Sequence, residues 1–417
     1  MIEMAQATAL AEHKLESLFK QRSFLFIWAI TICSSFSIAI FQFSQSWYVV
    51  KTLDKEASLG IVFIAANVPR ILFMAIGGVL ADRISRTKIL YAANFLRTIV
   101  LCSLLVMLAT GHLSLLSFII FGFLFGALDA FVWPANGSLL PNVVDNSQLT
   151  RANSVIQTTQ QSSLILGPMI GGLLVASSGG YMLSFGVPAV MLLISAILAY
   201  LLNIPASESS GTKKPGMWQS IMEGIDVVKQ SSFLKALFLS TIFLNVFVVG
   251  PLMMGLPIFV KNILDGSALD FSFIEGSMAA GMLISSVIIG ILNIKKRRGL
   301  MVTFSLFTMN IFFFWFSQSS SLYVCMMAIF FIGVTFPATN IPLISAVQSS
   351  VDKKLLGRLM GLLTMASMGL APLSLAVTSM LISYGFTIDN IMAGGALSLI
   401  IVNTIIMWKL PALRKME

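Results

Sequence analysis

Four ionisable residues stand inside long apolar stretches of the sequence: Arg70, Arg97, Asp129 and Glu275. Such a residue costs at least about 2.5 kcal/mol at the middle of a membrane helix unless it is paired or hydrated. A carboxylate in that setting can take up and release a proton near neutral pH, and this is the chemistry that couples a conformational change to a proton gradient. Asp129 is therefore the first candidate for a proton-coupling group, and Glu275 is the second.

The two arginines are candidate charge partners. Arg97 lies nine residues past Lys88, which corresponds to about 13 Å along a helix, and Asp129 lies at comparable depth. We therefore expect Arg97 to lie within ion-pair distance of Asp129, with Arg70 as the alternative partner. Two roles stay open for Asp129, namely proton coupling and a structural ion pair. The alternative for Glu275 is a solvated carboxylate near the membrane surface.

The elements that must position these residues are membrane helices. Of the 417 residues, 57% are hydrophobic and only 10% are charged, whereas a soluble domain carries about 25% charged residues. A membrane helix needs about 20 mainly apolar residues. Stretches of this kind predict an all-α membrane protein with twelve spans, at 24–50, 58–81, 88–110, 113–136, 152–177, 182–203, 234–260, 271–294, 299–318, 321–343, 355–384 and 388–409.

The basic residues between these spans predict the orientation of the chain. Of the 26 Lys and Arg residues, 21 flank the spans on one side, and only Lys51, Lys55 and Lys261 lie on the other. The positive-inside rule then places both termini in the cytoplasm. Loop positions of this kind account for the net charge of +9 without a nucleic-acid partner. The first apolar stretch is too long for a signal peptide, so we expect it to stay attached.

An internal repeat predicts two six-helix bundles. Pro134 is followed 34 residues later by Pro168, and Pro337 is followed 35 residues later by Pro372. Paired halves with a site at their interface are typical of transporters. The predicted parts are an N-terminal tail (1–23), two bundles (24–203 and 233–409), a linker with an amphipathic helix on the membrane surface (204–232) and a C-terminal tail (410–417).

Other chemistry is not indicated. The two histidines, His13 and His112, and the three cysteines show no metal-ligand spacing, and no cluster of nucleophile and base is present in the sequence. We therefore expect no metal site, no cofactor and no enzyme activity. Uncharged polar residues in the predicted spans are candidates for lining a substrate cavity, and these are Gln42, Gln45, Gln157, Gln161, Asn245 and Asn340.

A charged motif follows the second span. Residues 78–88 read GVLADRISRTK. They resemble the signature loop of the major facilitator superfamily, Gly-x-Leu-x-Asp-Arg-x-Gly-Arg-Arg/Lys, at the position where that family has it. Ser85 stands where the motif usually has Gly, and Thr87 displaces the next basic residue to Lys88.

The resemblance implies a cytoplasmic gate formed by Gly78, Asp82, Arg83 and Arg86. In the family, the aspartate faces the N-terminus of the eleventh membrane helix, which begins here near Leu355, and this contact holds the cytoplasmic side closed. Glycine allows the close approach of the helices. The alternative is that these charges only anchor the topology.

A second motif lies in the fifth span. Gly167, Pro168, Gly171 and Gly172 form the pattern Gly-Pro-x-x-Gly-Gly, which resembles the motif that exporters of the superfamily carry in this helix. Glycine and proline there bend a helix and let its neighbour pack closely. The resemblance favours an exporter over an importer.

Shorter matches narrow the resemblance to the branch that contains macrolide-efflux proteins and the enterobactin exporter. They include Pro69-Arg70, Leu96-Arg97 and Ala152-Asn153-Ser154. The resemblance implies proton-coupled efflux of a bulky organic compound, such as a drug or a siderophore, by a monomer in the bacterial cytoplasmic membrane. The alternatives are a proton-coupled uptake symporter and a membrane sensor or scaffold.

Overall fold

The computed structural model of the protein is helical throughout the part of the chain that it describes, and that part contains no β-strand. The described residues are 18–140, 143–145, 148–202, 231–292, 298–350 and 369–409, with isolated positions at 222, 226, 228, 229, 359, 362 and 363. Of residues 75–83 and 133–138 only the backbone is described. Residues 1–17 of the predicted N-terminal tail, the predicted C-terminal tail and most of the predicted linker fall outside these ranges.

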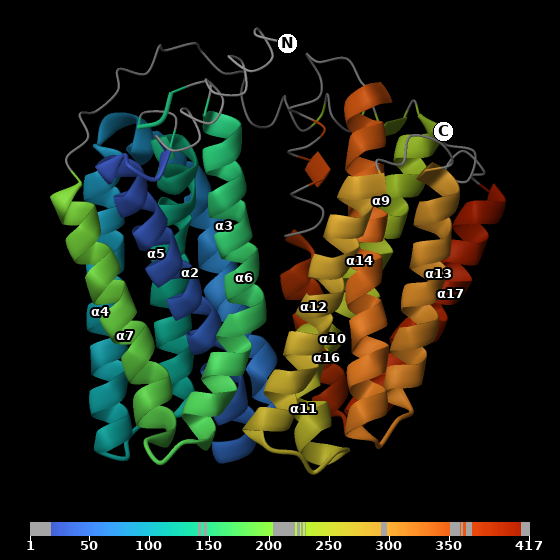
Figure 1. The fold of residues 1–417 in the computed structure, drawn as a ribbon. Coiled ribbons are helices and arrows are strands. Elements are labelled where there is room, and N and C mark those ends of the chain that lie inside the picture. The colour runs from blue at the N-terminus through green and yellow to red at the C-terminus, as the bar shows by residue number, and fades with distance from the viewer. Residues whose placement is uncertain are drawn as a thin grey trace, which may run out of the picture. The chain divides into compact units, whose positions relative to one another are not determined.

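The helices follow the predicted spans (Figure 1). The first six are α2 (Arg22–Trp47), α3 (Leu59–Arg83), α4 (Arg86–Ala109), α5 (Leu115–Leu139), α6 (Leu149–Ala176) and α7 (Gly180–Leu201). They are followed by α9 (Ser232–Leu244), α10 (Gly250–Met253), α11 (Gly255–Asn262), α12 (Ala268–Leu292), α13 (Arg298–Ser317), α14 (Leu322–Ser350), α16 (Ala371–Ser383) and α17 (Ile388–Lys409).

Within the described ranges, ten helical segments are long and apolar enough to cross a membrane. Helix α6 has 28 residues, which is sufficient length, but it is too polar to be among them. The first half of the predicted span 355–384 lies mostly outside the described residues, and α16 occupies its second half. The all-α membrane fold is confirmed.

The predicted span 234–260 is not one continuous helix. A π-helical turn over Asn245–Val249 separates α9 from α10, and α11 then continues to Asn262. Ser374 of α16 compensates for the break, because its hydroxyl accepts a hydrogen bond from the backbone N–H of Gly250 (2.8 Å) and donates one to the carbonyl of Val246 (2.7 Å). Broken helices of this kind are tolerated in membranes only where the freed backbone groups find such partners.

The chain forms two compact units. The first comprises residues 1–45 and 65–210, and the second comprises residues 46–64 and 211–417. Residues 46–64, at the end of α2 and the beginning of α3, therefore belong to the second unit, although α2 and α3 lie mainly in the first.

The core of the first unit includes a polar network where α2, α4 and α7 meet. The hydroxyl groups of Ser34 and Ser195 lie 2.8 Å apart, and Nδ2 of Asn94 donates to the hydroxyl of Ser195 at 2.9 Å. All three residues are buried. Hydrogen bonds between membrane helices contribute on the order of 1 kcal/mol each, so this network fixes the three helices against one another.

Candidate charge cluster and gate

The central feature of the first unit is a cluster of three charges contributed by α3, α4 and α5. One oxygen of Asp129, Oδ1, lies 2.5 Å from Nη2 of Arg97, and the other, Oδ2, lies 3.0 Å from Nε of Arg70. The predicted contact between Arg97 and Asp129 is confirmed. The alternative partner, Arg70, is present in the same cluster, so the carboxylate bridges both guanidinium groups.

Burial differs among the three side chains. Arg97 has no exposed surface, whereas the side chains of Arg70 and Asp129 are 26% and 21% exposed. The guanidinium of Arg97 also lies over the ring of Phe125 at 5.6 Å from its centroid. Within the described residues, Nε and Nη1 of Arg97 have no hydrogen-bond partner. The Asp129 carboxylate is therefore the principal compensation for a fully buried positive charge.

A glycine brings α3 and α5 close enough for this cluster to form. A Cβ atom at Gly126 would overlap the backbone carbonyl of Ala66 in α3. Gly126 precedes Asp129 by three residues and Ala66 precedes Arg70 by four, so each pair lies on one helical face. The close backbone approach and the ion pair are thus parts of one helix–helix contact.

The second coupling candidate has a different environment. Glu275 lies on α12 and is half-buried, and none of the described basic residues forms an ion pair with it. Its helix packs closely on α14, because a Cβ atom at Gly281 would overlap the carbonyl of Phe330, and one at Gly333 would overlap the carbonyl of Met278. Glu275 is therefore a carboxylate on a closely packed helix pair, with no ion-pair partner among the described residues.

The motif of the fifth span packs α6 against α2. A Cβ atom at Gly167 would overlap the side chain of Ala39, and one at Gly171 would come within 2.8 Å of the ring of Phe43. Pro168 lies inside α6, where its nitrogen cannot donate the usual helical hydrogen bond. Both glycines are thus required by close contact with the first membrane helix. Gly172 lies in the same helix.

Helix α6 also carries an exposed polar stripe. Its members lie three or four residues apart in the first half of the helix, and they are Asn153, Ser154, Gln157, Thr158 and Gln161. Polar groups on a membrane helix require water or protein partners, because hydrocarbon offers neither. This stripe identifies the face of α6 that is suited to a hydrated substrate path.

The other predicted cavity residues divide into two groups. Gln42 and Asn340 are exposed. Gln45 and Asn245 are buried, and Nδ2 of Asn245 donates to the carbonyl of Thr241 at 2.8 Å, at the beginning of the π-helical turn. The side-chain amide of Asn245 therefore already makes one hydrogen bond to the backbone of its own helix.

The predicted cytoplasmic gate lies mostly outside the residues whose side chains the structure describes. The backbone of Gly78, Asp82 and Arg83 forms the end of α3, but their side chains lie outside the described residues, as does the segment near Leu355 that was expected to face Asp82. Arg86 is the first residue of α4. The gate contact stays a prediction.

A second charge cluster, which was not predicted from the sequence, lies in the second unit. Nζ of Lys261 lies 2.8 Å from Oε1 of Glu56 and also pairs with Asp54, and Nδ2 of Asn262 donates to Oε2 of Glu56 at 2.9 Å. The side chain of Lys261 is only 17% exposed. A sequence signal existed, because Lys261 is one of only three basic residues on its side of the predicted spans.

These contacts shift two pKa values. The hydrogen bond and the positive charge of Lys261 hold the pKa of Asp54 below its ordinary range. Burial lowers the pKa of Lys261, but its hydrogen bonds with Asp54 and Glu56 and their charges more than offset this, so that its pKa is raised. Asp54 and Lys261 are therefore both charged at neutral pH.

Packing around this cluster attaches residues 46–64 to the rest of the second unit. The ring of Trp47 stacks on that of Phe271 with centroids 5.6 Å apart, and the hydroxyl of Ser379 donates to the carbonyl of Ala57. A Cβ atom at Gly60 would come within 2.9 Å of Ser379. Ion pairs, ring stacking and close backbone packing thus act on one short segment.

Comparisons with known proteins agree with this architecture. A family model described as "Major Facilitator Superfamily" matches residues 27–375. Macrolide efflux protein A of Streptococcus pyogenes is 25% identical over 289 residues, which cover 69% of this chain and 71% of that protein. The enterobactin exporter EntS of Escherichia coli O1:K1 / APEC is 31% identical over 133 residues, covering 32% of this chain and 31% of the exporter.

Solved structures show the same fold. The nucleoside transporter NupG superposes with a TM-score of 0.70 at 13% identity, covering 95% of this chain and all of that one. A bacterial homologue of the lysosomal transporter Spinster superposes with a TM-score of 0.68 at 14% identity and covers 94% and 95% of the two chains. At these identities the likeness concerns the fold alone.

Proposed function

Because the chain belongs to the major facilitator superfamily, and is thus a membrane transport protein and not an enzyme, we propose that it exports a bulky organic compound in exchange for protons. The compound is of the kind that its relatives are named for, such as a macrolide or a siderophore. The transporter acts as a monomer in the bacterial cytoplasmic membrane with both termini in the cytoplasm. It uses the proton gradient and no cofactor.

The observation that carries this proposal is the packing of α6 on α2 through Gly167 and Gly171. The motif that these glycines form is the one associated with exporters, and each glycine meets a side chain of α2 that leaves no room for a Cβ atom. The polar stripe of α6 lies on the same helix, so the motif fixes the position of a face suited to substrate. Relatives named as efflux proteins support the same direction of transport.

Asp129 is the proposed coupling residue. Its carboxylate is partly exposed, so a proton can reach it, and it bridges Arg70 and Arg97. Protonation would remove the negative charge from between two positive ones, and like charges at this separation repel each other strongly in a membrane interior. A change in the packing of α3, α4 and α5 would follow. Glu275 is the second candidate for coupling.

Transport into everted membrane vesicles tests the proposal. With the vesicle interior acidified, radiolabelled macrolide, enterobactin or staphyloferrin A should accumulate against its gradient, because everted vesicles take up what the cell exports. Accumulation that requires the opposite pH gradient would overturn export in favour of uptake by symport.

A matched pair of variants tests the role of the motif. Gly167→Ala places a methyl group against Ala39, whereas Gly394→Ala in α17 makes the same chemical change where nothing lies within 4 Å. We expect the first to lower uphill transport about tenfold or more and the second to leave it unchanged. Equal activity of the two variants would remove the motif as support for export.

A further inference from the structure

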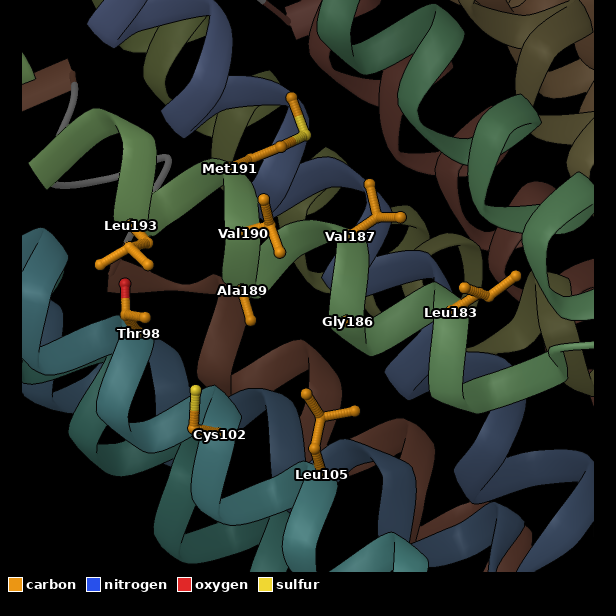
Figure 2. A pocket seen from close by; sticks show the side chains of 10 residues that line it. All are labelled: Thr98, Cys102, Leu105, Leu183, Gly186, Val187, Ala189, Val190, Met191 and Leu193. Carbon is orange, nitrogen blue, oxygen red and sulfur yellow. The ribbon is translucent and has the colours of Figure 1, made fainter. Parts of the chain in front are cut away.

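A groove lies between α4 and α7 in the first unit, and these two helices pack side by side (Figures 1 and 2). It encloses a volume of about 490 Å³. Its lining includes Thr98, Cys102 and Leu105 of α4 and Leu183, Gly186 and Val190 of α7. It is separate from the charge cluster, because Arg97 points away from it into the core.

The groove offers almost nothing to a polar ligand. The hydroxyl of Thr98 already donates to the carbonyl of Asn94 at 2.9 Å. The thiol of Cys102 and the thioether of Met191 are weak hydrogen-bonding groups. A polar compound would therefore lose its hydrogen bonds to water without replacement, whereas a hydrocarbon chain would lose nothing.

The groove opens on a membrane-facing surface. On α4 the exposed residues around it include Ile99 and Val106, and on α7 they include Ile194 and Ile197. In a membrane helix, an exposed surface of this composition contacts lipid, in contrast to the polar exposed stripe of α6. The groove is thus a recess in the protein–lipid interface.

The length and depth of the groove match one leaflet. Its lining on α7 runs from Leu183 to Leu193, ten helical steps or about 15 Å, which is half of the roughly 30 Å hydrocarbon core. Leu183 lies three residues from the beginning of α7, and Leu105 lies four from the end of α4. The groove therefore begins close to one membrane surface, on the side of the α4–α5 turn, and ends near the middle.

We propose that this groove binds one acyl chain of a phospholipid from the leaflet on the side of the α4–α5 turn. Gly186 is the residue that creates the room, because a Cβ atom at this position would meet nothing within 4 Å. Interactions with lipid involve no net hydrophobic gain, since lipid tails are equally apolar, so the preference for this site comes from shape.

Photo-crosslinking tests the proposal on the full-length protein. The protein is reconstituted into phosphatidylcholine–phosphatidylethanolamine vesicles that contain a phosphatidylcholine with a diazirine in its acyl chain, and adducts are mapped by mass spectrometry. We expect adducts on residues 98–105 and 183–193 to exceed those on the exposed apolar face of α13, around Phe304 and Ile311, by roughly fivefold. Equal labelling of the two faces would overturn the proposal.

Gly186→Leu places an isobutyl side chain in the groove from a position where the Cβ atom meets nothing within 4 Å, and it should remove this excess labelling. Gly394→Leu in α17 is the matched control, because its Cβ also meets open space, and it should leave the labelling of the groove unchanged. Gly186→Ala fills less of the groove and should reduce the labelling partially. Undiminished labelling of a folded Gly186→Leu protein would refute the assignment.

Discussion

Asp129→Asn separates the two roles that an intramembrane carboxylate can have. Asparagine keeps the volume of the side chain but carries no charge, so the guanidinium groups of Arg97 and Arg70 lose their shared partner. Removing one partner of a buried ion pair costs about 3 to 5 kcal/mol. Arg97 is fully buried and experiences this loss in full, whereas Arg70 is 26% exposed and is partly screened by water.

Two measurements on the purified variant distinguish the roles. Thermal unfolding in detergent reports the structural cost, and gradient-driven transport in vesicles reports the coupling. If Asp129 carries the coupling proton, the Asn variant should lose uphill export, while its substrate binding and downhill exchange remain measurable. If Asp129 is only structural, every transport mode should fall together with the unfolding temperature.

The double variant Arg97→Gln/Asp129→Asn is the control for stability. It removes the buried positive charge together with its partner, so it should regain most of the stability that the single variant loses. It should still lack uphill export if Asp129 carries the proton. An Asp129→Asn protein that unfolds at the wild-type temperature would refute the stability loss of about 3 to 5 kcal/mol. Normal export by the same protein would refute the coupling role of Asp129.

Two further outcomes follow from contacts in the second unit. Lys261→Gln should destabilise the protein at neutral pH more than Lys55→Gln does. Because the pKa of Asp54 is lowered, its ion pair with Lys261 stabilises the protein above the ordinary carboxyl pKa of about 3.9, and this stabilisation is lost as the pH falls below that range. Thermal unfolding should therefore show a difference between the two variants that shrinks toward pH 3. Gly281→Leu should sharply reduce the yield of folded protein, because its side chain would meet a backbone carbonyl of α14, whereas Gly290→Leu on the same helix should express normally. Similar yields of these two glycine variants in a detergent-solubilised size-exclusion assay would contradict the packing argument.

The sequence was sufficient for most of the spans and for the central ion pair, because both follow from the cost of transferring groups into hydrocarbon. Arg97 at its depth required a carboxylate, and Asp129 was the candidate at a similar depth. The fifth span was also predicted, although α6 is too polar to be among the ten apolar segments of the described residues.

Features that depend on contacts between distant segments were missed. Lys261 lies 207 residues from Asp54, and both flank apolar stretches without entering them, so no burial cost indicated that they were paired. The break between α9 and α10 depends on Ser374, which is 124 residues from Gly250 and supplies the hydrogen bonds that make a π-helical turn tolerable. No local pattern of residues contains that information.

The polarity of α6 has a consequence for the synthesis of the protein. A segment leaves the translocon for the bilayer according to its own transfer free energy, and the glutamines at positions 157, 160 and 161 make that quantity less favourable for α6 than for any of the ten apolar segments in the described part of the chain. Helix α7 follows after a turn of three residues and is strongly apolar. Insertion of α6 together with α7 as a hairpin would offset this deficit, because the favourable transfer of α7 is then added to that of α6.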